Sequence, residues 1–415
     1  MTGGAPATVP LRRNREFLLL QAGQLGSTVG SSSAAMAYPL VVLATTDSPL
    51  LAGTVVVARI LPGVLFGLLG GVAADRYDRK FLMITSDVAR AVAVGSLAVA
   101  ILVDRLTFGH IVAVAVVEGS FSVLFGPAAT AALRSVVATD QLPAAVSAQQ
   151  ARSATASLVG PPLGGALFGI GRAVPFVADA VSYTFSVVSL LLIRTPFQDR
   201  ARGGTAPRRG LSEGWRFLWD QPFLRTTTFL YGLTNFVGPG VLLGIVVVGE
   251  RQDLSGGTIG ALLAAFSGGL LVGSAVSGRL RRALSRRAIL LLELCAWPLI
   301  VLFVAWPNAY VLAAAILPAA IAIPVTDSVV VGHRLTITPD HLIGRVESVR
   351  STIALALAPL GSLLAGFLLG AFSPRVALLP FVAVAFVLPV WAALSPALRT
   401  ASAGASPTRH PVAAA

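Results

Sequence analysis

The chain has 415 residues, of which 55% are hydrophobic and 12% are charged, whereas a typical soluble domain has about 25% charged residues. So little polar surface could not cover a water-soluble fold, which makes a membrane the expected environment. The single cysteine excludes an internal disulfide and a multi-cysteine metal site, and the net charge of +13 lies in short gaps between apolar runs, a pattern typical of a cationic rim at a lipid surface rather than of nucleic-acid binding.

Twelve apolar segments follow one another, and each is long enough to span a bilayer, which takes about 20 residues in a helix. The first begins after three arginines, but it is too long for the apolar core of a cleaved signal peptide, so we expect it to be retained. The segments cover approximately residues 17–43, 50–73, 81–103, 108–136, 145–168, 174–193, 223–248, 258–280, 288–305, 310–334, 346–372 and 376–394.

These segments predict an all-α polytopic membrane protein with two pseudo-symmetric bundles of six helices. Most of the 31 basic residues fall on one side of the membrane if the N-terminus is cytoplasmic, and this excess predicts that both termini lie in the cytoplasm. Residues 211–218 have the spacing of a short amphipathic helix at the membrane surface. The predicted divisions are a cytoplasmic leader (1–16), an N-terminal bundle (17–193), a cytoplasmic linker (194–222), a C-terminal bundle (223–395) and a disordered cytoplasmic tail (396–415).

Polar side chains recur every three or four residues along the first segment, at Gln24, Thr28 and Ser31, so they share one face of a helix. A polar face toward lipid would be costly, and we expect it to line a central cavity, with contacts between packed helices as the alternative. A lining that is partly aromatic and carries few charges suits a small amphiphilic or weakly basic molecule. The other candidates for this lining are Phe121, Phe125, Tyr231, Asn235 and Phe236.

Two charged residues lie deep in apolar segments, Arg59 in the second and Glu118 in the fourth. At about 1.5 Å per residue they sit near the middle of the bilayer at matching depth, where an isolated charge costs at least about 2.5–3.5 kcal/mol. We therefore expect an ion pair, in which Glu118 either accepts a proton and frees Arg59 or forms a permanent structural contact. Asp179 and Asp327 are weaker candidates for proton coupling because they lie closer to helix ends, and Glu293 is expected to snorkel toward the cytoplasmic edge.

A short charged turn separates the second and third segments. Its acid, Asp75, could pair within the turn or cap the positive N-terminus of another helix, so a gating contact and a turn that only fixes topology are both open. Asp87 and Arg90 lie three residues apart on one face of the third segment and are expected to extend this network. The predicted gating group consists of Gly71, Asp75, Arg76, Arg79, Lys80, Asp87 and Arg90.

The fifth segment contains Gly160, Pro161, Gly164 and Gly165 within six residues. Glycine and proline allow a membrane helix to bend and to approach a neighbour closely. Ordinary packing of small residues is the alternative to a functional role for this stretch.

The turn from Gly71 to Lys80 resembles the loop signature G-x-x-x-D-R-x-x-R-[RK] of the major facilitator superfamily of secondary transporters. Residues 134–146 and 334–346 share Arg, Asp, Leu and Val at identical spacing, and repeated six-helix halves are how this superfamily is built. The chain is most similar to the branch of twelve-helix drug:proton antiporters that includes macrolide-efflux and enterobactin-exporter types. That likeness covers nearly the whole chain and, beyond the turn, rests on residues 127–145, 211–218 and 339–348.

The resemblance implies the major facilitator fold, in which the loop acid Asp75 would latch against the start of the eleventh helix near Gly344 and Arg345 and stabilise the outward-facing state. It also makes the fifth segment similar to the core of the antiporter motif G-P-x-x-G. The corresponding loop of the second half, residues 278–282, carries no acid, so the latch should exist on one side only. The chain also departs from the branch at two positions. Val146 stands where the branch often has Asn, and no acid occurs near Ser31, where the branch often has one, which increases the weight on Glu118 as the proton site.

The sequence thus favours a secondary active transporter of the bacterial inner membrane. It would export a drug, antibiotic or siderophore-like metabolite in exchange for protons by alternating access, as a monomer without metal or cofactor. Its expected partners are the small-molecule substrate, protons and the lipid bilayer, and not nucleic acid. An importer or facilitator of the same fold is the alternative within transport. From other classes, a non-transporting receptor or scaffold stays open, whereas no convergent triad supports an enzyme.

Overall fold

The computed structural model describes residues 10–197, 210–339 and 342–398, and every regular element in these ranges is a helix. Residues 1–9, 198–209 and 399–415, which belong to the predicted leader, linker and tail, lie outside this description. So do a few side chains within helices, that of Asp75 among them.

The first half of the described chain consists of six long helices and one short 3-10 turn. They are α1 (Arg15–Thr46), α2 (Pro49–Arg76), α3 (Arg79–Leu102), α4 (Phe108–Val136), η1 (Thr139–Gln141), α5 (Leu142–Ile170) and α6 (Val174–Leu192).

The second half begins with a short helix and contains several spans that are interrupted by a turn. Its elements are α7 (Gly210–Asp220), α8 (Pro222–Arg251), α9 (Gly256–Ala283), α10 (Arg286–Ala296), η2 (Trp297–Val301), α11 (Leu302–Ala305), α12 (Ala309–Ile337), α13 (Ile343–Ala356), α14 (Ala358–Ala371), α15 (Pro374–Ala377) and α16 (Leu379–Leu394).

Small polar residues begin several helices and allow very short connections. Asn14 caps α1 by accepting from the backbone N–H of Phe17 at 3.0 Å. Asp78 caps α3 in the same way, accepting from Phe81 N at 2.7 Å. Such caps satisfy N–H groups that have no partner within the helix. As a result only Tyr77 and Asp78 separate the end of α2 from the start of α3, at the charged turn singled out in the sequence.

Among the described residues, eleven segments are helical, long and apolar enough to cross a membrane. The sequence predicts twelve. The remaining prediction, 145–168, forms α5, which has 29 residues. Glycines, prolines and serines lower the hydropathy of α5, and it packs closely between α1 and α9. The small residues that make this close packing possible therefore also make α5 less apolar than its neighbours.

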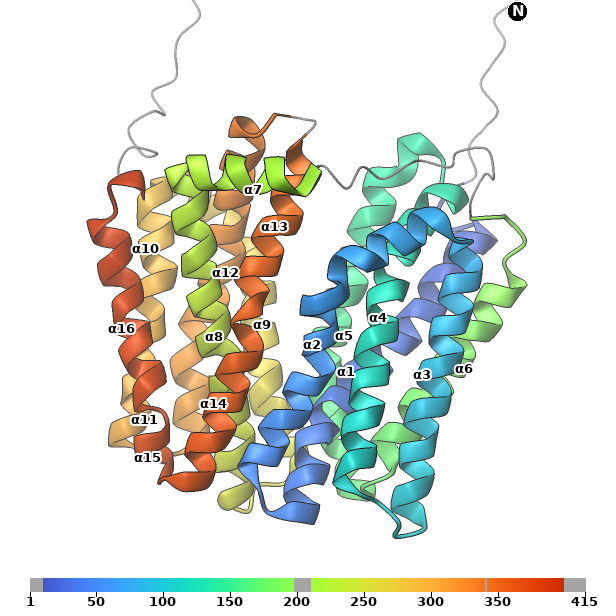
Figure 1. The fold of residues 1–415 in the computed structure, drawn as a ribbon, viewed down its shortest axis with the longest axis horizontal. Coiled ribbons are helices and arrows are strands. Elements are labelled where there is room, and N and C mark those ends of the chain that lie inside the picture. Colours follow the sequence, from blue (N-terminus) through green and yellow to red (C-terminus); the bar gives the residue numbers. More distant parts are fainter. Residues whose placement is uncertain (1–9, 198–209, 340–341, 399–415) are drawn as a thin grey trace, which may run out of the picture.

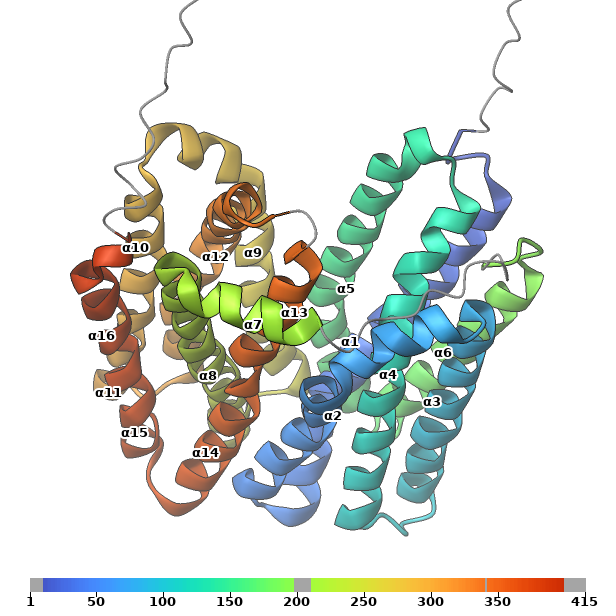
Figure 2. The same cartoon turned by 45° about the horizontal axis from the view of Figure 1, so that its top comes forward.

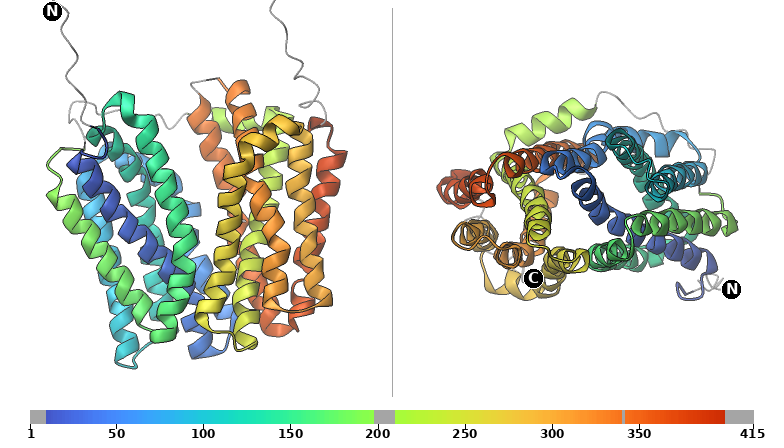
Figure 3. Two further views of the ribbon diagram at one scale, coloured as in Figure 1. Left: turned by 180° about the vertical axis from the view of Figure 1, so that it is seen from behind. Right: turned by 90° about the horizontal axis from the view of Figure 1, so that it is seen from below.

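The helices form two bundles, α1–α6 and α8–α16, that contact each other at one end and diverge at the other (Figure 1). The contacts join α2 to α14 and α5 to α9, as the view from below also indicates (Figure 3). Near its start α2 lies against α14 at Gly53, but an added Cβ at Gly63, Gly67 or Gly71 would meet no atom within 4 Å. The second half of α2 thus leaves the other bundle.

The short helix α7 lies across the diverging end of the second bundle, over α8 and α13 (Figure 2). Gly214 allows α7 to approach α13, because an added Cβ there would lie 2.8 Å from the backbone carbon of Arg345. Trp215 and Trp219 stack on one another with their ring centres 5.6 Å apart. This arrangement agrees with the predicted amphipathic helix.

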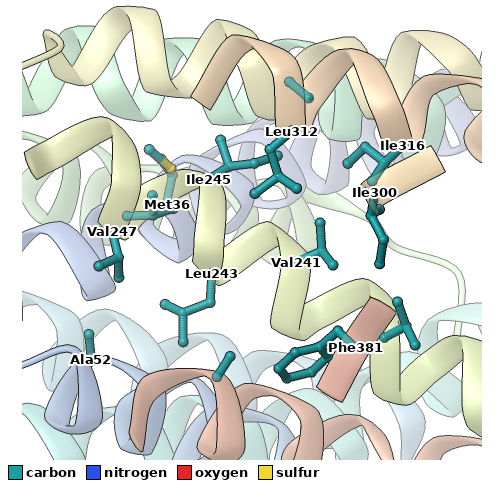
Figure 4. Close-up of a cluster of buried hydrophobic side chains, with 14 of the residues drawn as sticks. Met36, Ala52, Val241, Leu243, Ile245, Val247, Ile300, Leu312, Ile316 and Phe381 are labelled. Atoms are coloured by element: carbon teal, nitrogen blue, oxygen red, sulfur yellow. The ribbon is translucent and has the colours of Figure 1, made fainter. Parts of the chain in front are cut away.

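A continuous apolar core occupies the second bundle and reaches into the first. Figure 4 shows Val241 and Ile245 of α8 beside Leu312 and Ile316 of α12, with Phe381 of α16 below them. Protein interiors of this kind are close-packed.

Candidate functional site

A cavity of about 370 Å³ lies between the two bundles. It is lined by α1, α2 and α5 of the first bundle and by α8 and α9 of the second. Most of its wall is aliphatic or proline, with Phe266 as an aromatic contribution from α9. The polar side chains in this wall are those of Ser32, Tyr38, Arg59 and Ser267.

A second, more polar cavity of about 270 Å³ adjoins the first within the N-terminal bundle. Ser32, Ala35 and Arg59 line both cavities, so the guanidinium of Arg59 stands where the two meet. Thr28 and Ser31 of the predicted polar stripe of α1 are among the lining residues of the second cavity. The other residues that line the second cavity are Ser27, Arg90 and Phe125.

The ion pair expected from the depths of Arg59 and Glu118 is present. Nη2 of Arg59 lies 2.6 Å from Oε1 of Glu118 and also donates to the carbonyl oxygen of Ser31 at 3.2 Å. The Glu118 side chain is 3% exposed and that of Arg59 is 27% exposed. Glu118 is therefore buried behind Arg59, and Arg59 separates it from the cavities.

Two tyrosines, neither of them predicted from the sequence, complete the surroundings of Glu118. The hydroxyl of Tyr38 donates to Oε2 at 2.9 Å, and that of Tyr183 donates to Oε1 at 3.3 Å. The hydroxyls of Tyr183 and Ser31 lie 2.7 Å apart. Both tyrosines occur in apolar runs that contain no motif. Their contact with Glu118 therefore becomes visible only when the orientation of each side chain about the axis of α1 or α6 is known.

Glycine determines how closely α2 and α4 approach at this pair. An added Cβ at Gly119 would lie 2.2 Å from the carbonyl oxygen of Arg59. The glycine that follows Glu118 therefore allows the two backbones to touch, and this contact places the carboxylate within reach of the guanidinium. A side chain at this position would separate the charged partners.

Asp87 and Arg90 form a second buried ion pair, with Asp87 fully buried. The guanidinium of Arg90 stands 4.6 Å from the ring centre of Phe125 and 4.5 Å from that of Tyr183. The structure thus places Arg90 in the wall of the second cavity. The sequence instead grouped the pair with the charged turn that precedes it.

Asp179 is a third buried acid of the first bundle, and among the described residues it forms no ion pair. Its Oδ1 lies 3.3 Å from the hydroxyl of Ser182, and its Oδ2 has no hydrogen-bond partner. An added Cβ at Gly30 of α1 would stand 2.7 Å from Oδ1. Asp179 is therefore enclosed against α1 near Glu118, rather than exposed at a helix end.

The cations of the charged turn contact the backbone of the segment that follows α6. Arg79 donates to the carbonyl oxygen of Phe197 at 3.1 Å, and Lys80 donates to that of Ile193 at 2.5 Å. Arg345, at the start of α13, pairs with Glu213 of α7 at 2.5 Å. Because the side chain of Asp75 lies outside the described residues, the latch between Asp75 and the start of α13 stays a prediction.

The small residues of α5 make contacts on two sides. An added Cβ at Gly160 or Gly164 would lie within 2.3 Å of Ser32 or Ser33 of α1. One at Gly165 would lie 1.8 Å from the carbonyl oxygen of Gly256 in α9. The close approach predicted for this stretch is therefore present, and the contact between Gly165 and Gly256 joins the two bundles at the end where they touch.

Several predicted cavity residues lie elsewhere. Gln24 is buried without lining either cavity, Tyr231 donates a hydrogen bond to Asp327 within the second bundle, and Phe236 stacks on Phe381. Phe121 and Asn235 are partly buried and line neither of the two cavities.

The expectation that Glu293 snorkels to the cytoplasmic edge is wrong, because this residue is only 3% exposed. Its helix, α10, packs on α12 and α16, and Glu293 lies on the packed face, away from the surrounding lipid. A hydropathy pattern gives the depth of a residue but not its rotation about the helix axis, which explains the error.

The arrangement places a cavity that could hold a ligand next to a titratable group, the carboxyl of Glu118. A largely apolar cavity accommodates the hydrophobic part of a ligand, while hydroxyls and one guanidinium can orient its polar part. A buried carboxylate behind that guanidinium can exchange its cation for a proton. No covalent chemistry is needed for either event.

Residues 5–414 match a family described as transmembrane secretion effectors. The multidrug efflux pump Tap of Mycolicibacterium fortuitum is 27% identical over 410 residues, covering 94% of this chain and 98% of Tap. Tap of Mycobacterium tuberculosis strain H37Rv is 27% identical over 378 residues, covering 85% of this chain and 87% of Tap.

Solved structures share the fold. An inward-facing, occupied bacterial homologue of the human lysosomal transporter Spinster superposes with a TM-score of 0.72 at 15% identity, over 94% of this chain and 98% of that chain. An inward-facing bacterial homologue of the iron transporter ferroportin gives 0.70 at 15% identity, over 95% and 100%. At these identities the likeness concerns the fold alone.

Proposed function

We propose the following function for this chain, which belongs to the transmembrane secretion effector family, a branch of the major facilitator superfamily. It is accordingly a multi-pass membrane transporter and not an enzyme. Our proposal is that it exports a moderately sized amphiphilic molecule, such as a drug, antibiotic or siderophore-like metabolite, in exchange for protons. Multidrug efflux pumps among its relatives support export as the direction.

The observation that carries this proposal is the position of Arg59 between a mainly apolar cavity and a buried carboxylate. The cavity of about 370 Å³ has the size of a small-molecule site. Its wall suits an apolar body with a single polar or weakly basic group. Because Arg59 lines the wall and pairs with Glu118, the charge presented to the substrate depends on the protonation of Glu118.

The exchange follows from this electrostatic link. While Glu118 is ionised, the pair is neutral overall and tolerates a cationic substrate nearby. A proton on Glu118 leaves the positive charge of Arg59 uncompensated, which repels that substrate. Proton and substrate would therefore bind in alternation, as antiport requires. Asp179 and Asp327 are the further candidates for proton binding, and Asp179 is the nearer to Glu118.

Alternating access is supported by how the bundles meet. They touch where Gly53 approaches α14 and where Gly165 approaches Gly256, and they diverge toward the end that carries α7 (Figure 1). With both termini in the cytoplasm of a bacterial cell, this conformation would be open to the inside. We propose that the bundles at 17–193 and 223–395 rock about the cavity, in a monomer, and that Asp75 latches onto α13 when the inner end closes.

Proton-coupled export can be tested in inside-out membrane vesicles that respiration acidifies and that contain a pH-sensitive dye. Macrolides, siderophores and lipophilic cations are added in turn. We expect one class to release protons, and Glu118→Gln to abolish this release because glutamine cannot exchange a proton. Glu250→Gln, at the exposed end of α8, is the matched control and should behave as the wild type.

The outcomes separate the parts of the proposal. Proton release that persists in the Glu118→Gln vesicles would show that Glu118 is not the proton site. Intact cells give the direction, because an exporter lowers the accumulation of its substrate and an importer raises it. Binding of a compound without any flux would point to a receptor or scaffold instead.

A further inference from the structure

The second bundle contains a buried acid that the proposed function does not use. Glu293, on α10, is 3% exposed, and among the described residues no cation forms an ion pair with it. The cations at the start of its own helix are engaged elsewhere. Arg286 contacts His333 at 3.2 Å, and Arg287 donates to the carbonyl oxygen of Ala393 at 3.2 Å.

The corresponding helix of the first bundle, α3, has a cation beside its buried acid, and α10 lacks one. Both α3 and α10 begin with two basic residues, and both carry a buried acid about two turns later, Asp87 in α3 and Glu293 in α10. In α3 the acid is neutralised by Arg90. In α10 no basic residue follows, and the buried Trp297 stands one turn after the acid.

The groups that face Glu293 are neutral or acidic. From α12 they are Thr326 and Asp327, and from η2 the indole of Trp297. From α8 the phenol of Tyr231 faces it. The helix α16 has no titratable residue, and the basic residues of α9 are confined to its final turns. An ionised carboxylate without a cation is far costlier to bury than a neutral carboxyl.

A small space connects Glu293 to a hydrogen-bonded pair. Its volume is about 10 Å³, close to the least that one water molecule occupies. Its polar lining consists of Glu293 and Thr326 on one side and Thr227, Tyr231 and Thr234 of α8 on the other. These groups supply the two to four hydrogen bonds that a buried water needs. Tyr231 in turn donates to Asp327, which is partly exposed.

We propose that Glu293 is a proton-binding site of the second bundle, protonated in this conformation, whose proton exchanges through the small space beside Tyr231 and on to Asp327. Each bundle would then have its own proton-binding carboxyl, Glu118 in the first and Glu293 in the second. The proposal goes beyond the exchange assigned to Glu118 and does not depend on the identity of the substrate.

The test is infrared spectroscopy of the purified full-length protein in lipid nanodiscs at neutral pH, without substrate. The difference spectrum of the wild type minus Glu293→Gln should contain the carbonyl band of a protonated carboxyl. That band should shift in D₂O, and Tyr231→Phe should retain the band but slow its shift. Glu250→Gln, which removes an exposed acid of α8, should remove no such band.

A difference spectrum that contains only carboxylate bands would overturn the proposal, because Glu293 would then be ionised. A shift in D₂O that is equally fast in Tyr231→Phe would overturn the proposed route. If Glu293→Gln does not fold, Glu293→Asp retains an acid at the position and should move the carbonyl band without abolishing it. Since no transport is measured, failure of proton-coupled export in vesicles leaves this test unaffected.

Discussion

At the scale of single residues, Arg59 has two roles that can be separated. It compensates the charge of Glu118, and it presents a cation to both cavities. Arg59→Met removes the partner and leaves a buried acid, and breaking such pairs typically costs about 3–5 kcal/mol. Because Arg59 is 27% exposed, we expect the lower end of this range. Thermal unfolding in detergent, followed by tryptophan fluorescence, measures the loss.

The double variant Arg59→Met with Glu118→Leu is the control for this prediction. Replacing both members of a buried pair by apolar residues is often neutral or stabilising. The double variant should therefore unfold at a higher temperature than Arg59→Met alone while transporting nothing. An equal or lower unfolding temperature would mean that the pair itself stabilises the bundle.

At the scale of elements, the contact between α5 and α9 sets how closely the two bundles approach at the end where they touch. A Cβ at Gly165 would lie 1.8 Å from the carbonyl oxygen of Gly256, so Gly165→Ala must push the helices apart. Overpacking typically costs about 1–3 kcal/mol, which corresponds to a shift of about five- to 140-fold away from the conformation seen here. A cysteine placed in the cavity should therefore react faster, by a similar factor, with an impermeant reagent that is added at the outer face.

The same helix provides the control for this prediction. An added Cβ at Gly169 meets no atom within 4 Å, and alanine favours a helix over glycine by about 1 kcal/mol. Gly169→Ala should therefore leave both accessibility and transport at the level of the wild type. Equal effects of the two substitutions would show that glycine content, rather than the contact with α9, matters.

At the scale of the whole molecule, the separation of the bundles predicts from which side the cavity is reached. Ser267 lines the cavity from α9, and Ser267→Cys changes its shape very little. In a Cys295→Ser background, which removes the single native cysteine, an impermeant maleimide should label this position in inside-out vesicles and not in intact cells. Excess substrate should protect it. Labelling from the outer face alone would reverse the proposed orientation or the proposed state.

Much of this molecule is predictable from the sequence. The apolar segments correspond to the helices, and the confirmed pairing of Arg59 with Glu118 follows from depth along two of them. The sequence does not predict the direction in which a side chain points from its helix. Hydropathy does not show that Arg90 turns to the second cavity, or that Glu293 turns inward.

The membrane environment, the all-helical class and the depth of each buried charge follow from the sequence alone, because hydrophobicity and residue count along a helix are local properties. Which groups meet depends on how the helices pack. Tyr38 and Tyr183 reach Glu118, and the bundles touch at Gly165, because glycine contacts fix how close the helices come and how each is turned. Those distances depend on residues far apart in the chain, which no local pattern encodes.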